Sequence, residues 1–346
     1  EMLRSLVGSE MCIRDSRKYH ANDPSTGKPW TADESEMYLR ACADACETLM
    51  GEGKYALVSD PAKVATQYRS LFTSESVASG EVIWARAYDA SLNATHILNT
   101  YFVNMQYGSY SLTRQFVNTY LNRDGSRFTD KAGYEKTLFA DEFENRDYRL
   151  MQSIRYPGYT RRNNNVNTPY APDFGYCVTG YQPIKFVAPA DFGSDGYNLS
   201  YTDLPIIRTA EIYLNYAEAK AELGTLTQDD IDLTIKKLRD RAGMPNLDMA
   251  QANANPDPYL SAPETGYPNV TGSNKGVLLE IRRERTVELP CEGLRQWDML
   301  RWKEGAQLVP SSNGLDGFLG CYFPSLGEYD MNGDGKMDLC LWSGTK

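Results

Sequence analysis

Histidine is almost absent from this chain, which has only two, His20 and His96, among its 346 residues. A nucleophilic triad of the Ser-His-Asp or Cys-His kind would need one of them as its base. The sequence also lacks a G-x-S-x-G segment, an H-E-x-x-H segment and a glycine-rich phosphate loop. We therefore predict that the protein is not an enzyme and that its role is binding.

Paired cysteine motifs and long apolar runs are missing as well. The seven cysteines are scattered without a C-x-x-C pair, so their spacing indicates neither a zinc site nor a thioredoxin-type motif. Cys42 and Cys46 lie one helical turn apart and are expected to pack as small apolar groups. No apolar run reaches the roughly 18 residues of a membrane-spanning helix, and no signal peptide is visible.

Positive charge is also scarce, because 36 Lys and Arg stand against 46 Asp and Glu, for a net charge of −10. Nucleic acids and anionic membrane surfaces attract a positive field, so both are excluded as partners, whereas neutral sugars are not. Tyrosine is abundant, with 24 residues against 11 phenylalanines. Its flat apolar face and its hydroxyl suit a sugar ring and equally suit a half-buried position.

The opening sixteen residues, EMLRSLVGSEMCIRDS, have no periodic continuation into the residues after them. We expect residues 1–16 to be a non-native join or disordered, and residues 17–346 to form the folded domain. On this interpretation the natural N-terminus is missing, so the lack of a signal peptide says nothing about location.

Hydrophobic periodicity predicts helices along most of the chain. In the clearest one, steps of three and four residues separate the apolar positions, which puts them on one helical face. These positions are Ile207, Ala210, Leu214, Ala217 and Ala221. Thr227 is the predicted N-cap of the next helix, and the short connection makes the two helices antiparallel. Helices are predicted over residues 31–50, 61–72, 112–122, 206–223, 227–243, 275–289 and 293–304, and an extended piece over 81–89. The predicted fold class is all-α, with helix pairs and few short strands.

Residues 151–204 break this helical pattern with several prolines and glycines and seven tyrosines. A long irregular segment in a compact protein is usually functional or disordered, and the aromatic content argues against disorder. We predict that this segment contacts a ligand, with tyrosine rings for stacking and an amide for hydrogen bonding. The residues are Tyr156, Tyr159, Asn164, Tyr170 and Tyr176.

Two segments resemble signatures of the SusD/RagB family. LPIIRTAEIYLNYAEAKAELG at 204–224 is similar to its signature helix. LLEIRRERTVELPCEGLRQWDMLRWK at 278–303 is similar to its I-R-R-E-R-x-x-E-L-x-x-E-G-x-R-x-x-D-x-x-R-W pattern. RDYRL at 146–150 resembles a further element, with Tyr148 in place of a proline. Pro290, where the family prefers a helix former, is expected to kink or end its helix.

The resemblance implies tetratricopeptide-like helix pairs that support a loop-rich binding face, with residues 17–346 as the C-terminal two-thirds of the family fold. It implies a lipoprotein at the cell surface, held on the bacterial outer membrane only by an N-terminal lipid anchor expected to be missing from this chain. It further implies non-enzymatic binding of an oligosaccharide or polysaccharide and delivery to a SusC-like TonB-dependent transporter. On this resemblance, the ligand expected at the tyrosine-rich segment is a glycan. The alternatives are a helical scaffold that binds a peptide or protein nutrient, and a glycosidase.

The second of these segments carries a dense charged run. Glu284, Glu288 and Glu292 are spaced one helical turn apart, and pairs of carboxylates perform glycoside hydrolysis. Four arginines are interleaved with them, however, which favours ion pairs between helices and lowers the pKa of the carboxylates. We therefore interpret the run as structural. Trp297 and Trp302, further along, are predicted to be core anchors.

The segment DMNGDGKMD at 330–338 has the spacing of a calcium loop. Oxygen ligands fall at loop positions 1, 3, 5, 7 and 9, and a glycine at position 6 allows the sharp turn. They are Asp330, Asn332, Asp334, the backbone carbonyl of Lys336, and Asp338. Because position 12 is Leu341, the bidentate glutamate of an EF-hand is absent. This spacing predicts a weak Ca²⁺ site. The alternative interpretation of the segment is an Asn/Asp/Gly turn between strands.

Overall fold

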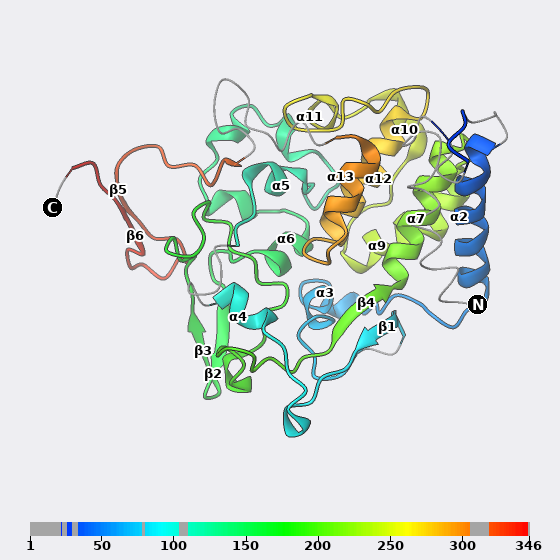
Figure 1. The fold of residues 1–346 in the computed structure, drawn as a ribbon. Coiled ribbons are helices and arrows are strands. Elements are labelled where there is room, and N and C mark those ends of the chain that lie inside the picture. Colours follow the sequence, from blue (N-terminus) through cyan, green and yellow to red (C-terminus); the bar gives the residue numbers. More distant parts are fainter. Residues whose placement is uncertain are drawn as a thin grey trace.

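The longer helices lie on the right of Figure 1 with one pair of short strands below them, and irregular segments with the other short strands make up the left side. This computed structural model describes residues 22, 26–29, 34–77, 80–103, 110–304 and 318–344. Its α-helices are α2 (Glu34–Gly51), α3 (Gln67–Ser70), α4 (Leu98–Val103), α5 (Arg114–Thr119), α6 (Tyr148–Ser153), α7 (Thr209–Glu222), α8 (Gln228–Leu233), α9 (Ile235–Arg241), α10 (Met249–Ala254), α11 (Pro258–Ser261), α12 (Lys275–Glu288) and α13 (Arg295–Trp302).

Short strands pair in antiparallel two-stranded sheets. In the described part of the chain, β1 (Val82–Arg86) pairs with β4 (Leu204–Arg208), β2 (Thr160–Asn163) with β3 (Val166–Pro169), and β5 (Gly327–Tyr329) with β6 (Leu339–Leu341). The predicted all-α class with few short strands is confirmed, and so is the extended piece predicted over 81–89.

The main core lies where α7 packs against α2 and α12 (Figure 1). Buried alanines keep the surface of α7 narrow, so that its neighbours approach closely. Cys42 and Cys46 of α2 are buried in this core, and Cys42 Sγ lies 3.9 Å from the Asn215 carbonyl oxygen on α7. Their predicted packing as small apolar groups is confirmed.

α7 begins at Thr209, three residues later than predicted. The preceding residues are extended as β4, in which Ile207 pairs with Trp84 and Leu204 pairs with Arg86. Apolar residues at this spacing fit the start of a helix as well as a strand. The partner strand lies more than a hundred residues earlier in the sequence, so a local pattern could not reveal the pairing.

The helix predicted over 227–243 is divided into α8 and α9 at Thr234, whose φ of −123° and ψ of −82° are not helical. Its predicted start is confirmed by a capping box. Thr227 Oγ1 accepts from the Asp230 N–H at 3.2 Å, and Asp230 Oδ2 accepts from the Thr227 N–H at 2.8 Å. α12 ends at Glu288, before Pro290, as predicted.

The two tryptophans of α13 have opposite environments. Trp302 is 1% exposed, as predicted, whereas Trp297 is 50% exposed, so the prediction of a core anchor is wrong for Trp297. Five residues correspond to about 140° around a helix, so the two side chains leave α13 on different faces.

Some predictions fall outside the described residues, namely the join at residues 1–16 and the start of the first helix at 31–33. Among the helices that the structure describes, none is both long enough and apolar enough to cross a membrane.

Candidate ligand-binding site

The charged run on α12 lies inside the protein and not on its surface. Glu288 is fully buried and binds arginines from α6, β4 and α9. Arg149 Nη1 lies 3.0 Å from its Oε2, Arg208 Nη1 lies 2.7 Å from its Oε1, and Arg241 Nη2 also contacts Oε1. Glu284, one turn earlier, lies 2.6 Å from Arg149 Nη1. The predicted ion pairs between helices are confirmed.

These ion pairs fix the protonation state of the carboxylates. Burial alone would raise the pKa of Glu288, but the surrounding guanidinium groups outweigh it and hold that pKa well below its usual range. Burial would likewise raise the pKa of Glu218 on α7, yet the Arg301 guanidinium, which contacts both of its oxygens, lowers the pKa to about 2. A general acid must hold a proton near neutral pH, so neither carboxylate is suited to that role.

The tyrosines predicted to contact a glycan differ in exposure. Tyr159 is 1% exposed, and Arg69 covers it, with Cζ 5.4 Å from the ring centroid and Nη2 3.2 Å from the hydroxyl oxygen. It therefore presents no face to a ligand, which corrects the prediction for this residue. Tyr156 is half-buried, with its ring edge-on to Tyr159 at 6.0 Å between centroids, and burial raises its pKa.

Asn164 and Tyr170 belong to one hairpin. β2 and β3 are joined by Asn164 and Asn165, whose φ values of 50° and 60° lie in the left-handed region that a two-residue hairpin turn requires. The segment predicted to be irregular thus contains a defined hairpin, with Asn164 exposed at its tip. Tyr170 is half-buried after β3, and its ring centroid lies 5.5 Å from the Arg155 guanidinium and 5.8 Å from that of Arg161.

The structure brings only some of the predicted residues together. Tyr156 contacts Tyr159, and the Tyr170 N–H donates to the Tyr159 carbonyl oxygen at 3.1 Å. Tyr176 lies in a separate turn, where its N–H donates to the Asp173 carbonyl oxygen at 2.9 Å. Glycan contact by Tyr156, Asn164, Tyr170 and Tyr176 stays a prediction.

Several exposed aromatic side chains of the described residues were not among the predicted contacts, and the most exposed are Tyr197 at 64% and Trp342 at 70%. Phe192 and Tyr201, on either side of Tyr197 in the sequence, stack with ring centroids 5.7 Å apart and an interplanar angle of 20°. The tyrosine count pointed to this segment, but it could not separate exposed from buried rings because tyrosine suits both positions.

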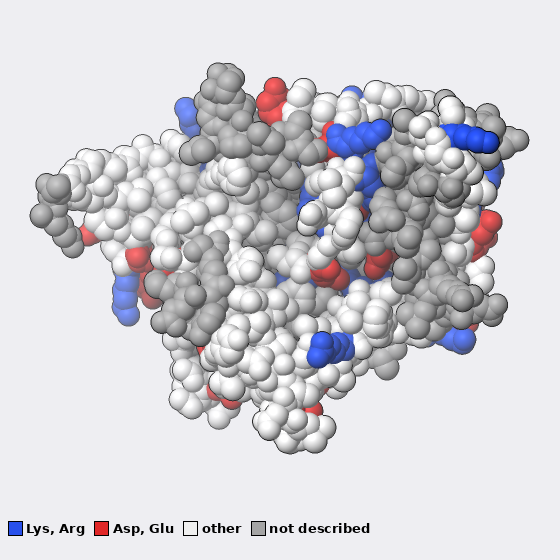
Figure 2. All heavy atoms as spheres, in the orientation of Figure 1, with Lys and Arg blue, Asp and Glu red and all other residues white. Residues whose placement is uncertain are grey.

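Charged side chains are sparse over the lower part of the face in Figure 2, where Figure 1 places β1, β2 and β3. A weakly charged surface with exposed aromatic rings can bind the apolar face of a neutral ring and hydrogen-bond its edges.

The predicted calcium loop is folded by hydrogen bonds to its own backbone. Asp330 Oδ2 accepts from the Gly335 N–H at 2.8 Å, and Asp338 Oδ2 accepts from the Met331 N–H at 2.8 Å. Within the described residues, no group of three or more His, Cys, Asp or Glu side chains is placed to hold a metal ion. The contacts are those of the turn alternative. Calcium binding by Asp330, Asn332, Asp334, Lys336 and Asp338 stays a prediction.

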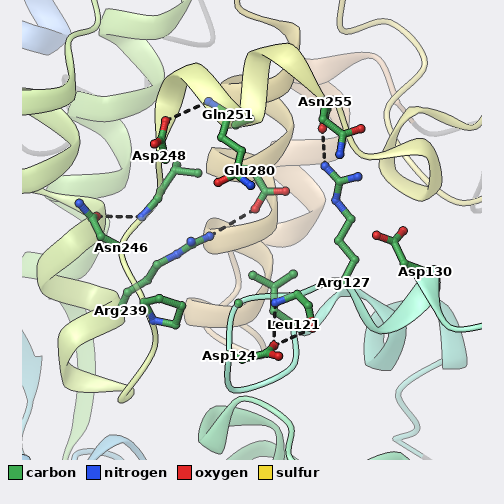
Figure 3. A pocket seen from close by; sticks show the side chains of 15 residues that line it. Leu121, Asp124, Arg127, Asp130, Arg239, Asn246, Asp248, Gln251, Asn255 and Glu280 are labelled. Carbon is green, nitrogen blue, oxygen red and sulfur yellow. Dashed lines mark hydrogen bonds and ion pairs between the residues drawn. The ribbon is translucent and has the colours of Figure 1, made fainter.

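A polar pocket of about 450 Å³ lies between the segment at 121–130, the segment at 245–255 and α12 (Figure 3). Arg239 of α9 and Glu280 of α12 form its floor and are joined by an ion pair of 3.3 Å. Asp124, Asp248 and Gln251 are among the exposed side chains of its walls. Sequence reasoning missed this pocket because its walls come from segments far apart in the chain.

Residues 80–331 match the sequence model of the SusD family, and the chain belongs to this family. No curated protein sequence matches the chain.

Solved structures share the fold at low sequence identity. A SusD-like protein from Bacteroides fragilis has a TM-score of 0.56 and 21% identity, over 78% of this chain and 53% of its own. A SusD-like carbohydrate-binding protein from the same species has a TM-score of 0.54 and 22% identity, over 79% of this chain and 54% of its own. A SusD superfamily protein from Parabacteroides distasonis has a TM-score of 0.51 and 18% identity, over 86% of this chain and 51% of its own. The chain thus spans about half the length of these relatives, and the predicted tetratricopeptide-like fold is confirmed.

Proposed function

We propose that the protein binds an oligosaccharide or polysaccharide at the bacterial cell surface without cleaving it. The observation that carries the proposal is membership of the SusD family over residues 80–331. A protein of similar fold from Bacteroides fragilis is described as carbohydrate-binding, which agrees with it. The exposed ring of Tyr197 and the half-buried rings of Tyr156, Tyr170 and Tyr176 are the proposed contacts.

Binding without cleavage is supported by the state of the conspicuous carboxylates. Glycoside hydrolysis needs one carboxyl group that holds a proton and a second that stays ionised, facing each other across the bond to be cut. Glu284 and Glu288 are buried and bound to arginines, and the pKa of Glu288 is well below its usual range. They hold helices together and have no access to a substrate.

Delivery is the second part of the proposal. In it, the full-length protein is held at the outer membrane by an N-terminal lipid anchor and passes its glycan to a SusC-like TonB-dependent transporter. Its support is the family to which the chain belongs. Co-purification of the tagged full-length protein with such a transporter from solubilised outer membranes tests it, and a tagged protein recovered without one would contradict it.

Affinity gel electrophoresis against plant, host and microbial polysaccharides tests the binding itself, with reducing-sugar release measured in the same samples. We expect slower migration in at least one polysaccharide gel and no release of product. Release of reducing sugar would overturn the non-enzymatic part. Normal migration in every gel by a folded, full-length protein would favour the alternative of a scaffold that binds a peptide or protein nutrient.

A further inference from the structure

The polar pocket on α9 and α10 is built independently of the tyrosine-rich segment. One of its walls is the turn at 122–126, in which Asp124 Oδ1 accepts from the Ser126 N–H at 2.9 Å and from the Ser126 hydroxyl at 2.6 Å. Gly125 in this turn has a φ of 85°, and a Cβ there would lie 2.6 Å from Pro245 Cγ on the opposite wall. The turn therefore packs against Pro245 only because residue 125 is glycine.

The opposite wall is equally fixed. Asp248 caps α10, since its Oδ1 accepts from the Gln251 N–H at 2.9 Å. Arg127 links the two walls by donating to the backbone carbonyl of Asn255 (Figure 3). A pocket whose walls are tied by internal bonds loses little conformational entropy when a ligand enters.

Arg239 provides a cationic group at the floor. It is only 4% exposed, and its Nε donates to Glu284 Oε2 at 3.0 Å while Nη2 donates to Glu280 Oε2 at 3.3 Å. Its Nη1 makes no hydrogen bond to any residue that the structure describes, and Arg239 lines the pocket. Because Nη1 is not among the described buried polar atoms that lack a partner, it is open to the pocket, where a water or a ligand hydroxyl can accept a hydrogen bond from it.

The walls add groups that both accept and donate hydrogen bonds. Within the described residues, the side-chain amides of Gln251 and Asn255 and the carboxylate of Asp130 bind no other protein group, and all three side chains are exposed. None of the described residues that line the pocket is aromatic, so a ligand is recognised there by hydrogen bonds and not by ring stacking.

Charge decides which hydroxylated ligands fit. The lining holds four carboxylates, Asp124, Asp130, Asp248 and Glu280, and two guanidinium groups, Arg127 and Arg239, so that 2 − 4 gives a formal charge of −2. A uronate or sulfated sugar would be repelled by this excess. Neighbouring hydroxyl groups of a sugar both donate and accept hydrogen bonds. They can therefore donate to the carboxylates and amide oxygens of the lining and accept from its amide nitrogens and the guanidinium nitrogen.

We infer that this pocket is a second glycan site, which holds the terminal residues of an uncharged oligosaccharide through their hydroxyl groups. The inference rests on the proposed glycan-binding function and adds to it a place and a substrate class. The volume of the pocket, about 450 Å³, lies within the range of roughly 300–1,000 Å³ for small-molecule sites.

Calorimetric titration of the 346-residue chain tests the site, with malto-, cello-, xylo- and mannohexaose as neutral probes and hexagalacturonate as the acidic probe. The double variant Gln251→Ala, Asn255→Ala removes both free amides while leaving the backbone of α10 unchanged. Gln296→Ala is the matched control, because it removes an exposed amide from α13, away from the pocket. We expect the double variant to bind the best neutral probe roughly tenfold more weakly, and the control to bind it as the natural chain does.

The outcomes separate the inference from the function on which it rests. Equal affinity of the double variant and the natural chain for a neutral probe would overturn the pocket and leave glycan binding intact. Binding of hexagalacturonate alone would overturn the substrate class. No heat with any probe, together with unchanged migration in every polysaccharide gel, would overturn both. The double variant Asp130→Asn, Asp248→Asn tests the role of charge. It removes two negative charges from the pocket, so it is expected to bind hexagalacturonate more tightly. The start of α10 should be unaffected, because asparagine is as good an N-cap as aspartate.

Discussion

Buried glutamates in two regions of this protein respond to burial in opposite ways. Among the helices, Glu218 and Glu288 are bound closely by guanidinium groups, and their pKa values are low. Beside the tyrosine-rich segment, Glu142 accepts from the Tyr181 hydroxyl at 2.9 and 2.7 Å, and its ion pair within the described residues is with Arg114 Nη2, at 3.7 Å. Burial raises the pKa of Glu142 to about 7.

The number of close cations, and not the depth of burial, decides the direction of these shifts. The helices are therefore joined by charges that stay ionised over the ordinary pH range. The region that carries the tyrosine-rich segment contains a buried carboxyl group that ionises near neutrality. We expect the helical side to resist changes of pH and the tyrosine-rich side to respond to them.

The largest effect is expected from Glu288→Gln. The substitution leaves three buried guanidinium groups without their shared carboxylate, so the free energy of unfolding should fall by about 3–5 kcal/mol in urea titrations followed by circular dichroism. Glu36→Gln is the control, because Glu36 pairs with Arg40 at the surface of α2, where such a pair is worth about 0.3–0.5 kcal/mol. A loss below about 1 kcal/mol in Glu288→Gln would show that the arginines find other partners.

Acid should weaken the helical side in a defined window. The pKa of Glu218 is lower in the folded protein, at about 2, than its ordinary value of 4.5. Its contribution to stability is therefore fully present above pH 4.5 and is lost as the pH falls through 2. A shift of this size corresponds to about 3 kcal/mol. In Glu218→Gln, the difference in unfolding free energy between pH 5 and pH 2 should shrink by about that amount, and an unchanged difference would contradict the assignment.

Glu142 should act in the opposite direction. Because its folded pKa of about 7 is above its ordinary value of 4.5, its contribution is fully present below pH 4.5 and is lost as the pH rises through 7. Glu142→Gln keeps an acceptor for Tyr181 but does not ionise. We expect the variant to reduce the loss of stability between pH 4.5 and 7.5 by about 2–3 kcal/mol, measured by thermal unfolding across that range. A pH profile identical to that of the natural protein would refute this.

The tyrosines offer a smaller effect on affinity. Tyr197→Ala should weaken binding to the retarding polysaccharide by about 0.5–1.5 kcal/mol, the value typical of an aromatic contact. Tyr159→Phe is the paired control, because the Tyr159 ring is buried and should not touch the ligand. Equal affinity of both variants in affinity gels would remove Tyr197 from the binding surface.

The smallest effect is expected at the loop of residues 330–338. If it binds Ca²⁺ with the affinity of weak extracellular sites, 1 mM Ca²⁺ should stabilise the protein by about 0.5–1.5 kcal/mol. Asp334→Ala should abolish both this gain and the heat of Ca²⁺ titration. An absence of heat in the natural protein would leave the turn alternative.

Local sequence predicted the helices well because their apolar spacing depends on neighbours within the same element. α12 and its end before Pro290, and the N-cap at Thr227, are examples. The start of α7 was misplaced because β4 is held by β1, which comes from a distant part of the chain. Trp297 was misplaced because the burial of α13 depends on which of its faces the other helices cover.

The candidate site could be predicted only in part. The tyrosine-rich segment stood out by composition, but the exposure of each ring depends on long-range contacts, such as that of Arg69 over Tyr159. The pocket on α10 has no local signature, since Asp124, Arg239 and Glu280 are separated by long stretches of chain. Polar residues at such spacing look like ordinary surface until the fold brings them together.

The position of Glu288 late in the chain also constrains the order of events during synthesis. Arg149, Arg208 and Arg241 precede it by 139, 80 and 47 positions. Each also pairs with an earlier carboxylate, Arg149 with Asp147 and both Arg208 and Arg241 with Glu81. Glu288 is the carboxylate that joins these separate pairs into one buried cluster, so the complete cluster can form only after residue 288 of 346 has been synthesised.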